Sequence, residues 1–171
     1  MPDIYSINAW ATATIYDANS IVLVGNTYYY ATTRHTSAAA FATDLAAGRW
    51  NGVLTNDGQQ RPYFFWRASY DYALNIKPAV RKIQYGDGYT SDYSDGINNI
   101  LLPFEASFKD RDLNEYTAIV HFLSTRAGVE RFFFIPPSPF NVIKLFVCQD
   151  FTATQTFYDK YTVTAKFEER F

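Results

Sequence analysis

The stretch from Asp112 to Gly128 constrains the fold most, because it carries the signals of a helix between segments that have the pattern of strands. Asp112 and Glu115 stand at capping-box spacing, and Gly128 is a typical helix stop. The apolar residues between them recur at helical spacing and would form one buried stripe: Leu113, Tyr116, Ile119, Val120 and Leu123. We therefore expect one amphipathic helix here, packed against the rest of the fold.

The segments on either side of this helix are rich in β-branched and aromatic residues or alternate apolar with polar ones, as strands do. Residues 63–72, 80–85 and 99–109 precede the helix, and residues 131–135, 142–148 and 158–167 follow it. The alternation in 80–85 predicts a strand with one buried face. Gly86-Asp87-Gly88-Tyr89 predicts a tight turn. This order predicts a mainly β (α+β) domain dominated by antiparallel strands.

The first third of the chain has a different composition and is poor in charge. Residues 20–24 and 27–33 predict a β-hairpin around a turn at Gly25-Asn26. A short helix is expected over 38–47, capped by Thr36 or Ser37 and ended by Gly48, with Phe41 and Leu45 on one face.

Trp50 would then pack back across this hairpin. A polar, turn-rich stretch follows and places a module boundary near Gln60. We therefore divide the chain into a small aromatic-rich module, residues 1–60, and a core domain, residues 61–171.

Composition narrows the classes of partner. Aromatic residues make up 19% of the chain and charged residues only 19%, so part of the surface is expected to be covered by other proteins. A tyrosine-rich monomer kept soluble by its hydroxyls is the alternative. The net charge of −2 gives no reason to expect nucleic acid as the main ligand, and no apolar stretch is long enough to span a membrane. The start lacks a signal peptide, which predicts folding in a reducing cytoplasm.

The residues that could support catalysis are few. Neither His35 nor His121 has a Cys or His nearby at metal-ligand spacing, and Cys148 lies in a strand-like run where a buried free thiol is expected. Gly86-Asp87-Gly88 is too short for a phosphate-binding loop and lacks its lysine. We therefore predict no enzyme activity, no metal and no cofactor.

Residues 78–171 resemble the phage minor tail protein family, of the lambda type. The resemblance rests on an ordered set of motifs: Val80-Arg81-Lys82-Ile83-Gln84-Tyr85 followed by the Gly-Asp-Gly-Tyr loop, Gly96-Ile97-Asn98, Phe122-Leu123 with Gly128, Phe132-Phe133-Phe134-Ile135-Pro136-Pro137, and the closing strand with Phe167-Glu168-Glu169. It implies a fold related to tail-tube and distal-tail proteins, a β-sandwich or split barrel with one packed helix.

The resemblance also implies a function. Members of the family are structural subunits of the tail tip of long-tailed phages (siphophages). This implies a ring, expected to be hexameric, that joins the tail tube to the hub proteins of the tip. The expected partners are further copies of the chain, the tube protein and the hub proteins. The expected location is the tail tip of the virion, after assembly in the host cytoplasm.

Two segments are candidates for the assembly contacts, because loops on a rigid sheet commonly carry recognition. One is the loop formed by Gly86, Asp87, Gly88 and Tyr89. The other belongs to the segment after the helix and comprises Phe132, Phe133, Phe134, Pro136 and Pro137.

The aromatic residues of the first module allow a second function. Their pattern resembles small aromatic modules appended to phage tail proteins and chitin-binding enzymes. Trp10, Tyr28, Tyr30 and Trp50 would then stack on the sugar rings of a host surface glycan during adsorption. The alternatives are that these aromatics form the core of a small domain, or that the module interlocks neighbouring subunits.

Overall fold

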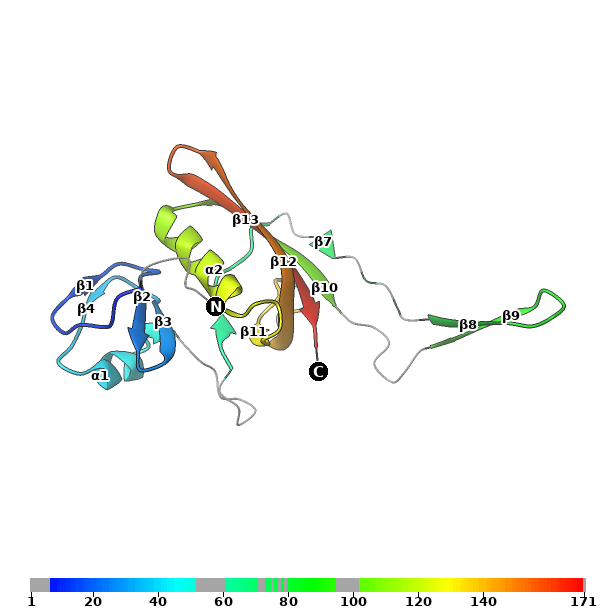
Figure 1. Cartoon of the computed structure of the whole chain (residues 1–171), viewed down its shortest axis with the longest axis horizontal. Coiled ribbons are helices and arrows are strands. Elements are labelled where there is room, and N and C mark those ends of the chain that lie inside the picture. Colours follow the sequence, from blue (N-terminus) through cyan, green and yellow to red (C-terminus); the bar gives the residue numbers. More distant parts are fainter. Residues whose placement is uncertain are drawn as a thin grey trace.

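The computed structural model describes residues 7–51, 61–70, 73–74, 76, 78, 80–94 and 102–170 (Figure 1). Within these ranges the chain is mainly β with two helices. The first module contains β1 (Ile15–Tyr16), β2 (Ile21–Val24), β3 (Thr27–Ala31), β4 (His35–Thr36), α1 (Phe41–Ala46) and β5 (Trp50–Asn51). The remainder contains β6 (Tyr63–Phe64), β7 (Ala73–Leu74), β8 (Val80–Gln84), β9 (Thr90–Ser94), β10 (Pro103–Arg111), α2 (Leu113–Thr125), β11 (Phe132–Phe134), β12 (Lys144–Phe157) and β13 (Lys160–Glu169).

The largest sheet has six strands in the order β6-β11-β12-β13-β10-β7. Its neighbours are antiparallel except β6 and β11, which run parallel. Helix α2 packs along the sheet beside β13 (Figure 1). The mainly β class with one packed helix in this region is therefore confirmed.

Helix α2 begins where the sequence predicts. The Asp112 carboxylate accepts the backbone N–H of Glu115 at 2.7 Å, and Gly128 lies just beyond the helix with a φ of +71°. Only half of the capping box forms, because the Glu115 carboxylate pairs with Arg111 at 2.8 Å. Ile119, Val120 and Leu123 are buried as expected, but Leu113 is 50% exposed. The predicted stripe was wrong at Leu113, which lies in the first turn of the helix.

Phenylalanine fills the space between the helix and the sheet. Phe167 on β13 lies at the centre of this core, with its ring centroid 5.2 Å from those of both Phe132 and Phe134. Phe64 lies 5.3 Å from Phe122 of α2 and 5.3 Å from Phe167. Most of these pairs meet edge to face, the arrangement that aromatic quadrupoles favour, and each such pair contributes about 0.5–1.5 kcal/mol beyond its buried area. The aromatic content thus specifies the main core.

The first module forms the predicted hairpin. Ile21 to Val24 pair with Tyr30 to Thr27 in antiparallel register, and Trp50 pairs with Ala31 on the other side. Val22, Ala31 and Trp50 form a second, smaller core. The predicted packing of Trp50 across the hairpin is confirmed.

Helix α1 is shorter than predicted, spanning 41–46 in place of 38–47. Its N-cap is Ala40, which makes no side-chain cap, so the prediction of Thr36 or Ser37 was wrong. The Ser37 hydroxyl instead accepts the N–H of Thr14 and donates to the carbonyl of Ala11. The buried Asp44 carboxylate accepts the N–H of Ala38 at 2.9 Å, which holds that residue outside the helix.

Three strand predictions needed correction. Residues 63–72 were predicted as one strand, but only Tyr63–Phe64 pair as β6. Strand β8 has no buried face, because within the described residues it pairs only with β9 and every one of its residues is exposed. Strand β12 runs on to Phe157, so the predicted end at 148 missed its outer half, whereas β13 begins at Lys160, close to the predicted 158.

Some predictions fall outside the described residues. These are the absence of a signal peptide at the start, the turn-rich stretch with the boundary near Gln60, and the Gly96-Ile97-Asn98 motif. No helix in the described ranges combines the length and the apolar character that a membrane span requires.

Candidate functional site

The hairpin of β8 and β9 stands apart from the sheets (Figure 1). Its turn is closed by two backbone bonds, from the N–H of Tyr85 to the carbonyl of Tyr89 at 2.8 Å and from the N–H of Gly88 to the carbonyl of Tyr85 at 3.1 Å. Gly88 has a φ of +80°, which a residue without a Cβ adopts readily. The predicted tight turn is thus confirmed. Its flanking side chains, Tyr85 and Tyr89, are 50% and 76% exposed.

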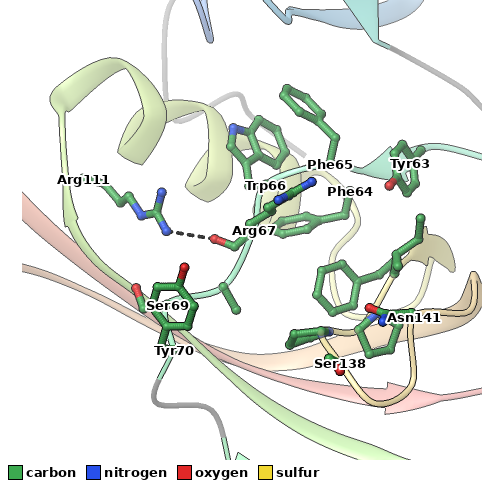
Figure 2. A pocket seen from close by; sticks show the side chains of 15 residues that line it. Tyr63, Phe64, Phe65, Trp66, Arg67, Ser69, Tyr70, Arg111, Ser138 and Asn141 are labelled. Carbon is green, nitrogen blue, oxygen red and sulfur yellow. Dashed lines mark hydrogen bonds between the residues drawn. The ribbon is translucent and has the colours of Figure 1, made fainter.

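A groove of about 580 Å³ opens between the extended segment 63–70 and the segment 134–141 (Figure 2). Phe65 and Trp66 stack within it with ring centroids 4.3 Å apart, and Pro137 belongs to the opposite wall. The Arg111 guanidinium donates to the carbonyl of Arg67 at 2.8 Å, which ties the first segment to the end of β10. The groove is therefore lined by aromatic and proline side chains together with polar ones, Ser69, Ser138 and Asn141 among them, and by two arginines.

The candidate contact residues lie at the hairpin turn and beside the groove, which Phe134, Pro136 and Pro137 line but Phe132 and Phe133 do not. Gly86, Asp87, Gly88 and Tyr89 form the exposed hairpin turn. In the second segment, Phe132 and Phe134 are fully buried in the main core and Phe133 is half-buried. Phe134 also touches the groove with its neighbours Pro136 and Pro137.

Sequence reasoning missed one wall of the groove: Tyr63, Phe65, Trp66, Arg67 and Tyr70. The dense aromatic run was visible, but we read it as a strand. The signal that remained was the presence of Arg67 inside an apolar run. A charged side chain there is expected to face solvent, and it does.

The rings of the candidate glycan contacts pack against other ring side chains of the chain. Tyr30 is 1% and Trp50 is 4% exposed. Trp10 is half-buried with its ring edge-on to Phe41 at 5.7 Å, and Tyr28 is half-buried against His121 at 4.6 Å. A ring that stacks on a sugar needs one open face. This packing supports the interpretation that these aromatics form cores.

The nucleophilic and basic residues occupy structural positions. Burial raises the pKa of Cys148 to about 12, and its thiol donates to the carbonyl of Asp150 at 3.4 Å. His121 is 1% exposed and lies beside the Tyr30 hydroxyl. Among the described residues, no group of three or more His, Cys, Asp or Glu residues is placed to hold a metal ion.

Comparison with known families identifies the class of protein to which this chain belongs. Residues 62–171 match the family described as phage minor tail protein, and the chain belongs to that family. The match starts earlier than the resemblance at residue 78 and so includes the groove segment as well as the hairpin. The chain is thus a structural component of the virion tail and not an enzyme, as predicted.

Two relatives carry a more particular name. Tail tip protein M of Escherichia phage N15 is 30% identical over 95 residues, which are 56% of this chain and 81% of that protein. Tail tip protein M of Escherichia phage lambda is 28% identical over 82 residues, which are 48% of this chain and 74% of that protein.

Proposed function

We propose that this chain forms a ring in the tail tip and connects the tail tube to the hub proteins of the tip. Two kinds of observation support the proposal. The relatives are named tail tip proteins, and the chain presents a protruding hairpin that suits contact with a neighbour. A ring of six copies is the order that the family resemblance implies.

The exposed β8–β9 hairpin is the observation that carries the proposal. Apolar and aromatic side chains along it are open to solvent: Val80, Ile83, Tyr85, Tyr89 and Tyr93. Burying such surface against a neighbour is favourable by roughly 25 cal/mol per Å² before the costs of association. A hairpin that adds nothing to its own core is expected to be retained for contacts with other subunits.

The geometry of such a contact favours a ring. The hairpin lies to one side of the molecule, and a neighbour can accept it on a different surface (Figure 1). Contacts between two different surfaces are heterologous, and they close into a ring when the rotation between subunits divides a full turn. The tube and the hub would then meet the two faces of that ring.

Cryo-electron microscopy of purified tails tests this proposal. The expected map shows the chain as a ring of six between the tube and the hub, with the β8–β9 hairpins inside intersubunit contacts. A chain that is missing from the tail, or present as a single copy with its hairpins in solvent, contradicts it. Native mass spectrometry of the purified chain then measures whether the ring forms before tail assembly.

A further inference from the structure

We propose that the turn of the β8–β9 hairpin of one copy docks in the groove between segments 63–70 and 134–141 of the next copy. The two candidate contact segments would then be the two halves of one repeated interface. This inference rests on the proposed ring and names the surfaces that build it.

Charge is the first argument for this pairing. Asp87 stands at the tip of the turn, and the turn has no basic residue between Gln84 and Thr90. Arg67 lies at the groove with its side chain exposed, and Arg111 adds a second guanidinium there. Arg111 is already paired with Glu115, but within the described part of the chain neither Arg67 nor Asp87 has an ion-pair partner. Opposite unpaired charges on the two surfaces favour their association.

Aromatic character is the second argument. Asp87 is flanked by the exposed rings of Tyr85 and Tyr89. In the groove the half-buried Phe65 stacks on the buried Trp66 (Figure 2), and Pro136 and Pro137 also line it. Tyrosines are favoured at interfaces because their rings cover apolar area while the hydroxyl stays hydrated. An acidic turn between two tyrosines therefore matches a groove lined by aromatic and proline side chains and by two arginines.

Geometry makes the contact intermolecular. The hairpin points away from β6 and β11, which border the groove, so the turn and the groove of one copy lie at separate places (Figure 1). The turn of a second copy can enter the groove that the turn of the first copy does not reach. The other hairpin tip, at β12–β13, also carries exposed aromatics, but there Asp159 is followed at once by Lys160, which cancels its charge.

A charge swap in the full chain tests the inference. Arg67→Glu, Asp87→Arg and the double variant are each supplied from a plasmid during infection by the parental phage with this gene inactivated. The amount of chain in purified tails and the plaque titre are measured. Each single change is expected to lower both by roughly ten-fold or more, and the double change to restore most of the loss. Lys160→Glu makes the same change of charge as Arg67→Glu, but at the other hairpin, and is expected to have little effect.

The outcomes separate this inference from the proposed function. If the unmodified chain is missing from the tails, the proposed function fails. If the chain forms its ring but the double variant is no better than the single variants, the hairpin–groove contact is wrong and the ring stands. An equal loss with Lys160→Glu also overturns the contact. Thermal unfolding of each purified variant checks that the fold is retained, as the exposure of both side chains predicts.

Discussion

The hydroxyl of Tyr30 lies 3.0 Å from Nδ1 of His121, which joins the N-terminal hairpin to helix α2 across 91 residues of sequence. Both side chains are 1% exposed. Burial raises the pKa of Tyr30 well above its usual range, so the hydroxyl keeps its proton and can donate it to this nitrogen. The Tyr30 ring also packs on Trp66 and Phe122 in the main core. The first module is therefore fastened to the larger sheet by a residue that belongs to both.

Removing this hydroxyl should destabilise the whole chain. Tyr30→Phe keeps the ring but leaves the buried imidazole without this partner, which costs about 1–2 kcal/mol of the free energy of unfolding. Urea unfolding of the full chain measures the loss. Tyr93→Phe, at an exposed hairpin position, is the matched control and should change little. Equal effects of the two changes would contradict a buried hydrogen bond.

The cap of helix α2 makes a smaller contribution. Asp112→Ala removes the acceptor for the N–H of Glu115 and should lower the free energy of unfolding by about 1 kcal/mol. Asp112→Asn keeps an oxygen in the same place and should retain most of the stability. Thermal unfolding of the two variants distinguishes these results. A loss as large for Asn as for Ala would show that the charge matters and not the cap.

The thiol of Cys148 should be inert in the folded chain. With a pKa of about 12, its thiolate fraction at pH 8 is on the order of a thousand-fold below that of a free cysteine. Reaction with a chromogenic disulfide should be slow in buffer and fast in denaturant. The unfolded thiol ionises first, so this shift makes the chain less stable as the pH rises from about 9 towards 12. Equal rates in buffer and denaturant would contradict the burial.

The tyrosines of the β8–β9 hairpin should separate stability from assembly. Tyr85→Ser with Tyr89→Ser should change the free energy of unfolding by less than about 1 kcal/mol, because both side chains are exposed. The same pair of changes should lower the amount of chain found in purified tails. Tyr158→Ser, 87% exposed on the other hairpin, is the control for loss of an aromatic side chain. Unchanged incorporation of the double variant would argue against the hairpin as a contact.

Local signals in the sequence predicted several elements correctly. The cap at Asp112, the stop at Gly128 and the turns at Gly25-Asn26 and around Gly88 depend on the backbone preferences of residues close together in the chain. The outer half of β12, up to Phe157, was missed because most of its threonine and glutamine residues are exposed, and only Phe151 and Ala153 in it are partly buried. This part of β12 is a strand because it pairs with β13, Thr152 with Thr164 and Ala153 with Val163.

The candidate site likewise has one part that the sequence predicted and one part that it did not. The sequence identified the exposed turn at Asp87, because glycines and an acid mark a tight turn wherever it lies. It could not identify the groove, because Phe65, Trp66 and Arg67 form a wall only when Pro136 and Pro137 stand opposite. The burial of Trp50 and Tyr30, which favours core packing over glycan contact, was likewise decided by neighbours distant in the sequence.

The sequence by itself determined the family, the mainly β class, the helix and the turns, because motif order and local backbone preference need no partner in space. The tertiary structure decided which aromatic side chains are buried and which remain exposed. Phe132 and Tyr89 are both aromatic residues in candidate contact segments, yet one is fully buried and the other is 76% exposed. Burial depends on what the folded chain brings to each side chain, and that is set by long-range packing.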